Sequence, residues 1–288
     1  MSTQTGGYFV PAPTAWPFYL TIGLFLMVIG IAGYLNGYGA SLVTWMGLAV
    51  VVALVWIWFR GIINESERGA YNAQVDATYR WGMGWFIFSE VMFFAAFFGA
   101  LFYARQLSLP WLGGAGDGIM TNAVLWSGYE TSWPSNGPGN VGGEFGIIPP
   151  WGVPFLNTLL LLTSGVTITM AHHGLRENAP RWKVVAWMVA TVALGCIFLF
   201  FQAEEYIVAY RDLNLTLESG IYGSTFFMLT GFHGMHVTLG TLMLIVITVR
   251  LAKGHFTAEQ HFGFEGVAWY WHFVDVVWLG LFIFVYIV

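Results

Sequence analysis

Seven apolar segments of about twenty residues determine what this chain can fold into, because a helix of that length spans the hydrocarbon core of a membrane. The segments are approximately 16–35, 40–59, 82–104, 153–173, 183–209, 222–249 and 266–288. Only 9% of the residues are charged, whereas a soluble domain carries about 25%. Their length, and the lack of sustained polar–apolar alternation, favour helices over barrel strands. The sequence therefore predicts an all-α membrane protein with seven transmembrane helices.

Basic residues indicate how these helices are oriented. One side of the predicted membrane carries eight of the ten Lys and Arg residues, namely Arg60, Arg68, Arg80, Arg176, Arg181, Lys183, Arg250 and Lys253. The other side has only Arg105 and Arg211. By the positive-inside rule, the N-terminus lies inside and the C-terminus outside. The long connection 105–152 then lies outside, and its many Gly and Pro residues predict a surface loop.

Four ionisable side chains lie deep in the predicted helices: Glu90, Asp275, His233 and His236. At about 1.5 Å per residue, Glu90 lies roughly 12 Å and Asp275 roughly 14 Å from the inner ends of their helices. His236 lies further out, and its spacing of three from His233 places both rings on one helix face. Polar groups at this depth face the interior of a bundle and have partners there. His233, His236 and Asp275 are therefore candidate intramembrane partners of Glu90.

The carboxyl group of Glu90 stands among aromatic, aliphatic and small residues in FIFSEVMFFAAFFG (86–99). Removal from water disfavours the charged form of a carboxyl group. We therefore expect Glu90 to be protonated at neutral pH and to donate a hydrogen bond inside the bundle. A buried carboxyl also suits a proton relay, and the residues alone leave both the structural and the relay interpretation open.

Histidines raise the question of a haem or metal ligand. Two residues three apart on one helix cannot both be axial ligands of one iron, so His233 and His236 would need a partner on a facing helix. His172 and His173 lie at the inner end of the fourth segment, and His272 lies in the seventh. No Cys/His cluster or HExxH motif is present, so packing and hydrogen bonding between helices is the favoured interpretation. We predict no metal site and no catalytic residue.

Cations and tryptophans meet at the predicted inner boundary of the membrane. The set comprises Arg80, Arg250, Lys253 and His255, beside Trp56 and Trp58. Aromatic and basic belts are general features of this boundary, and the same residue types also bind anionic lipid head groups. Composition alone favours an ordinary boundary belt over a binding site for anionic lipid.

Five long motifs stand out along the chain: RWGMGWFIFSEVMFF (80–94), VPFLNTLLLLTSGVTITMAHH (153–173), FQAEEY (201–206), GIYGSTFFMLTGFHGMHV (220–237) and HFGFEGVAWYWHFVDVVW (261–278). They resemble one family, subunit III of the haem–copper cytochrome c oxidases. Looser matches to this family are WP at 16–17 and NES at 64–66. The resemblance covers all seven segments, which suits the oxidases that use cytochrome c.

The resemblance implies a two-helix pair (1–60), an inner connection (61–81) and a five-helix bundle (82–288) around a V-shaped cleft that holds phospholipids. It implies a chain without haem or copper, which lie in subunits I and II. Subunit I is the main contact and subunit II a further partner, and cytochrome c is the substrate of the complex. The implied function is to stabilise subunit I, bind lipid and support proton uptake in a proton-pumping oxidase.

Motif by motif, Glu90 corresponds to the buried glutamate of the family that reacts with carbodiimide. The lipid-facing residues of the family correspond to Arg80, Arg250, Lys253 and His255. The resemblance therefore favours phosphate contacts by these residues, whereas composition alone favoured an ordinary boundary belt. This sequence departs from the family at Gly99, where Trp is usual, and at Gln260, where His is usual. The loop 105–152 is longer than in mitochondrial relatives, which favours the cytoplasmic membrane of a bacterium over the mitochondrial inner membrane.

Two other functions remain as alternatives from the sequence. A proton-coupled transporter with Glu90 and Asp275 as carriers would need broken helices or an inverted repeat, and the sequence indicates neither. A b-type cytochrome would show a haem absorption band in the isolated chain. The net charge of −5 gives no sign of nucleic-acid binding.

Overall fold

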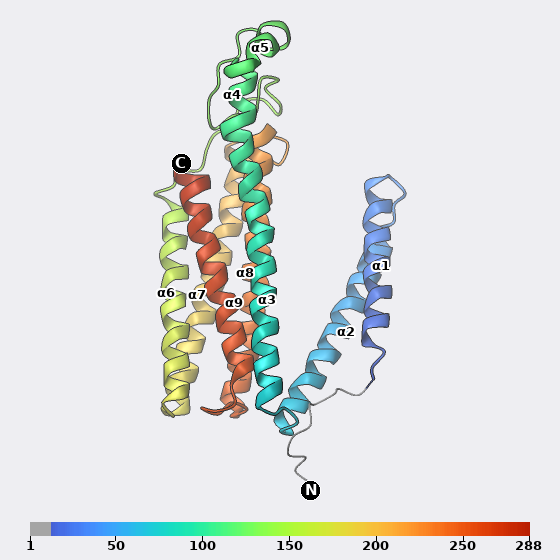
Figure 1. Cartoon of the computed structure of the whole chain (residues 1–288), viewed down its shortest axis with the longest axis vertical. Helices are drawn as coiled ribbons and strands as arrows, with labels where there is room; N and C mark the ends of the chain where they lie inside the picture. The colour runs from blue at the N-terminus through green and yellow to red at the C-terminus, as the bar shows by residue number, and fades with distance from the viewer. Residues whose placement is uncertain (1–12) are drawn as a thin grey trace. The chain divides into compact units, whose positions relative to one another are not determined.

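A computed structural model describes residues 13–288. Seven of its helices are long and apolar enough to cross a membrane, and no strand occurs in the described part of the chain. These are α1 (Trp16–Leu35), α2 (Ser41–Glu67), α3 (Ala73–Tyr103), α6 (Val153–Arg176), α7 (Arg181–Asp212), α8 (Gly220–Lys253) and α9 (Phe262–Leu281) (Figure 1). The prediction of an all-α protein with seven membrane-spanning helices is confirmed.

The described part of the chain divides into two compact units, one that ends at Arg80 and one that comprises Trp81–Val288. In the first, α1 and α2 form an antiparallel hairpin whose turn uses Gly37 and Gly39 at positive φ. The two helices approach closely through glycines: a Cβ on Gly30 would lie 2.3 Å from Thr44 N, and one on Gly47 would lie 2.4 Å from Met27 N. Small residues at helix crossings are the usual device of membrane helices, since lipid provides no hydrophobic force that drives helices together.

Tyr71 anchors the connection between α2 and α3. Its hydroxyl donates to Glu65 Oε2 at 2.9 Å. Burial, followed by hydrogen bonds with Tyr79 and Glu65, raises the pKa of Tyr71 above its ordinary value. The phenol therefore stays neutral and keeps its donor role over the whole neutral range of pH.

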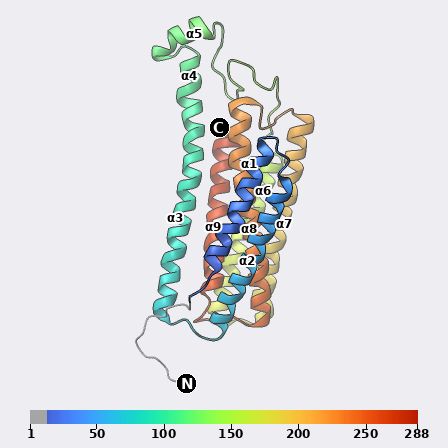
Figure 2. The same cartoon turned by 90° about the vertical axis from the view of Figure 1, so that its right-hand side faces the viewer.

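In the second unit, α6, α7, α8 and α9 pack into a bundle, each against its neighbours, with α9 closing onto α6. The amino-terminal helix of this unit, α3, contacts α8 and α9 through aromatic rings. Phe93 and Phe232 have centroids 5.0 Å apart, and Phe94 lies 6.1 Å from Phe273. In Figure 2, α3 runs the length of the bundle and continues beyond it into α4 (Leu109–Leu112) and α5 (Ile119–Leu125).

Two fully buried tryptophans of α9 fix the bundle. Trp271 Nε1–H donates to Ser164 Oγ at 2.8 Å, and Trp278 Nε1–H donates to Thr158 Oγ1 at 2.9 Å. Glycines make room for the Trp271 ring: a Cβ on Gly195 or on Gly240 would lie 2.9 Å from it. The ring thus packs on α7 and α8 while its N–H bonds to α6, so one side chain joins four helices.

The outer loop does not begin at residue 105 as expected, because helical structure continues beyond the end of α3. π-helical turns (Ala104–Ser108) continue the helix into α4, whose first turn contains Pro110. The loop that follows packs on the start of α8, where Trp133 and Phe145 contact Tyr222 at ring distances of 5.4 and 5.5 Å.

Candidate functional site

Glu90 and His236 meet between α3 and α8. Glu90 Oε2 lies 2.9 Å from His236 Nε2, and the two side chains expose 22% and 7% of their surface. Of the three partners that the sequence suggested for Glu90, His236 is the one that the structure places against it. The carboxyl group is therefore turned toward a helix of its own bundle.

The second nitrogen of His236 determines how protons are shared in this pair. His236 Nδ1 lies 2.6 Å from the carbonyl oxygen of Phe232, and a carbonyl only accepts, so Nδ1 carries a proton. If the imidazole is neutral, Nε2 accepts from a protonated Glu90. If the ring is an imidazolium, Nε2–H donates to a carboxylate. Both forms are neutral overall, and both place one proton between Nε2 and Oε2.

Aromatic residues pack around His236 in this pair. Phe94 lies edge-on to His236 with centroids 5.1 Å apart, and Tyr270 stacks on the ring at 6.2 Å. The hydroxyl of Tyr270 also donates to the backbone carbonyl of His236 at 3.3 Å. A hydrogen bond in such an apolar environment is strong, and an unpaired partner is costly. The pair can hold α3 on the bundle and can also hold or pass one proton.

His233 is wholly buried one turn away from His236. Its Nε2–H donates to the carbonyl of Val274 at 3.2 Å. The ring packs against Phe198 and Trp278, at centroid distances of 5.8 and 5.1 Å. These contacts join α8 to α7 and α9 and fit the packing interpretation of this histidine.

Asp275 lies apart from Glu90 and faces α6. It exposes 6% of its surface, and its Oδ2 lies 3.8 Å from Nδ1 of His272 on the same helix. Gly165 leaves the space that the carboxyl group occupies, because a Cβ there would lie 2.6 Å from Oδ2. The two deep carboxyl groups thus belong to separate contacts, one with α8 and one with α6.

Gly165→Ala is expected to destabilise the bundle by about 1–3 kcal/mol, the usual cost of overpacking a close contact. The added methyl group must displace the Asp275 carboxyl or separate α6 from α9. The check is the temperature at which the purified subunit unfolds in detergent. Gly84→Ala is the matched control, since a Cβ there meets no atom within 4 Å. Equal stability of the two variants would contradict the close contact.

The residues expected to bind lipid fall in both units. In the first unit, Arg80 pairs with Asp76 at 2.8 Å, and Trp56 and Trp58 are exposed. In the second unit, the guanidinium of Arg250 is buried and lies 4.4 Å from the Phe256 ring centroid.

Beyond Arg250, Lys253 is exposed in the last turn of α8, and His255 follows the helix half-buried.

One buried carboxyl group was missed by sequence reasoning. Glu205 on α7 exposes 3% of its surface, and the hydroxyl of Tyr286 donates to its Oε1. Its neighbour Glu204 is exposed. A single sequence gives no signal that separates the two, because either residue of the EE pair could face the bundle.

Comparisons with known proteins identify relatives along nearly the whole chain. A family model described as cytochrome c oxidase subunit III matches residues 7–124 and 116–288. A cytochrome c oxidase subunit 3 of Marchantia polymorpha is 40% identical over 276 residues, which cover 95% of this chain and 93% of the relative. Proteins of the same name from Felis catus and Arabidopsis thaliana are 40% and 39% identical over 289 residues, 99% of this chain and 98% of each relative.

Proposed function

Because the chain belongs to the cytochrome c oxidase subunit III family, we propose that it is a subunit without a redox centre that stabilises subunit I, binds phospholipid and supports proton uptake. The chain is a multi-pass membrane subunit of an oxidoreductase complex. The observation that carries the proposal is the similarity over nearly the full length, which includes the bundle that holds Glu90 and His236. The proposed complex transfers electrons from cytochrome c to dioxygen and pumps protons.

Haem and copper are proposed to lie in subunits I and II. The hydrogen bonding of the deep histidines supports this assignment. His236 uses Nδ1 for the carbonyl of Phe232 and Nε2 for Glu90, and His233 uses Nε2 for the carbonyl of Val274. These side chains serve contacts between helices, which suits a subunit that maintains a proton-pumping partner.

The lipid role is proposed for Arg80, Arg250, Lys253 and His255, with Trp56 and Trp58 at the same boundary. Exposed tryptophans on α2 and an exposed lysine in the last turn of α8 suit contacts with phosphate and glycerol groups. We further propose the two-helix pair and V-shaped lipid cleft of the family, with the N-terminus inside. The membrane proposed is the cytoplasmic membrane of a bacterium, with the mitochondrial inner membrane as the alternative.

Purification of the tagged chain in mild detergent tests this function. We expect haem and copper to purify with the chain, together with cytochrome c oxidase activity. An oxidase reconstituted without the chain should still transfer electrons but should take up protons more slowly and lose activity during turnover. A chain that purifies alone and moves ions or substrates across liposomes would instead support a transporter.

A further inference from the structure

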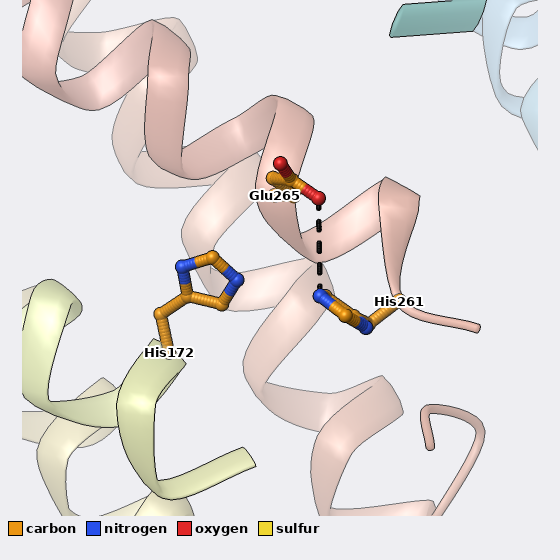
Figure 3. A group of neighbouring side chains, drawn as sticks. All are labelled: His172, His261 and Glu265. Atoms are coloured by element: carbon orange, nitrogen blue, oxygen red, sulfur yellow. Dashed lines mark ion pairs between the residues drawn. The ribbon is translucent and has the colours of Figure 1, made fainter. Parts of the chain in front are cut away.

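Three potential metal ligands meet where α6 ends and α9 begins. His172 stands in the last turns of α6, His261 immediately precedes α9, and Glu265 lies in the first turn of α9 (Figure 3). One donor atom from each lies within 4.8 Å of the others. Within residues 13–288, this is the one group of three His, Cys, Asp or Glu side chains with such spacing. We call it the His–His–Glu triad.

We propose that the His–His–Glu triad binds a divalent transition-metal ion, with Zn²⁺ as the best match. Two imidazoles and one carboxylate form a ligand set that zinc uses in proteins, with a fourth position left for water. Imidazole donors select transition metals over Mg²⁺ and Ca²⁺, which prefer oxygen ligands. The sequence alone predicts no metal site, but the fold brings His172 to His261 and Glu265.

The geometry needs only small side-chain movements. His261 directly precedes α9 and Glu265 lies in its first turn, and His261 Nε2 is 3.8 Å from Glu265 Oε2. Zinc bonds of about 2.0–2.2 Å in a tetrahedron place ligand atoms about 3.3 Å apart. Figure 3 shows the His172 ring turned toward the other two side chains. Rotamer adjustments of His172 and Glu265 can close the remaining gap.

An unpartnered nitrogen gives an independent reason for a ligand. Nε2 of His172 is buried and has no hydrogen-bond partner among the described residues. A buried polar atom without a partner is costly, and most such atoms in proteins have one. The rings of His172 and His261 also pack together, with centroids 5.3 Å apart. A bound cation would engage the lone pair of His172 and would draw the two rings onto one centre.

Zinc content of the purified protein tests the proposal. The oxidase carrying the tagged chain is treated with a chelator, incubated with Zn²⁺, desalted and analysed by mass spectrometry for zinc per chain. Wild type is expected to hold one zinc ion more than His172→Ala, His261→Ala or Glu265→Gln. His173→Ala is the matched control, because His173 adjoins His172 but is exposed, and this variant should keep the full zinc content.

Equal zinc content in wild type and Glu265→Gln would overturn the proposal and leave an ordinary His261–Glu265 ion pair. Loss of the same zinc in His173→Ala would place the ion elsewhere. A second measurement covers variants that fail to assemble: anomalous X-ray scattering at the zinc edge from wild-type crystals. A peak between the three side chains is expected, and its absence after soaking in Zn²⁺ would contradict the site. The site uses residues of this chain alone, so its failure leaves the proposed oxidase role untouched.

Discussion

Replacing Trp271 by alanine is expected to destabilise the five-helix unit by about 3–5 kcal/mol, the range for truncating a fully buried Trp in a packed core. The ring fills space that Gly195 and Gly240 leave open, and its N–H bonds to Ser164. Lipid is as apolar as the ring, so the loss consists of packing and hydrogen bonding more than transfer from water. The expected result is a subunit that unfolds or leaves its complex at a much lower temperature.

Two further tryptophan variants show whether the loss of stability comes from the Trp271 ring and its N–H. Trp271→Phe keeps part of the ring but loses the N–H, so it should fall between wild type and Trp271→Ala. Trp182→Ala is the control for losing a tryptophan, because Trp182 exposes 69% of its surface. The midpoint of thermal unfolding in detergent, followed by circular dichroism, is the measurement. A Trp271→Ala protein as stable as the Trp182→Ala protein would show that the bundle is not organised around this ring.

The seven helices could be predicted from the sequence because a segment that spans a membrane has few possible backbone conformations. Every backbone polar group in the bilayer must be satisfied internally, so a long apolar run becomes a helix whatever surrounds it. The exact ends are less constrained. π-helical turns at 104–108 carry α3 into α4, past the expected start of the loop at 105.

The sequence limited the partner of Glu90 to three candidates but could not show which of them Glu90 contacts. Depth along the helices placed His233, His236 and Asp275 near the right level, and the i,i+3 spacing put both histidines on one face. Rotation of each helix about its axis decides which group points at which neighbour. That rotation depends on close contacts such as Gly165 against Asp275, which are visible only once the helices are packed.

The same limit explains what the sequence did not reveal. Glu205 and the His–His–Glu triad both depend on residues that are far apart in the chain: Tyr286 for the first, and the approach of α6 to α9 for the second. His172 was noted only as a histidine near a helix end. Its importance comes from the position of His261 and Glu265, which the topology of the bundle supplies.

Glu90→Gln and Glu90→Leu are expected to differ strongly in how well the subunit assembles and in oxygen consumption. With a neutral His236, the amide of Gln donates to Nε2 as the protonated carboxyl group does, so the Gln variant should assemble and transfer electrons at nearly the wild-type rate. Leu leaves Nε2 buried without a donor, at a cost of about 1–3 kcal/mol. The measurements are subunit content after purification and steady-state oxygen consumption. Abolished oxygen consumption in a fully assembled Glu90→Gln enzyme would favour the relay interpretation.

Infrared spectroscopy then decides between the two protonation states of the Glu90–His236 pair. A neutral pair predicts a carbonyl stretch of a protonated carboxyl group in wild type that is missing from Glu90→Gln. Asp275→Asn is the control, since Asp275 occupies a separate contact with α6 and its removal should leave the Glu90 band in place. An imidazolium–carboxylate pair predicts no such band.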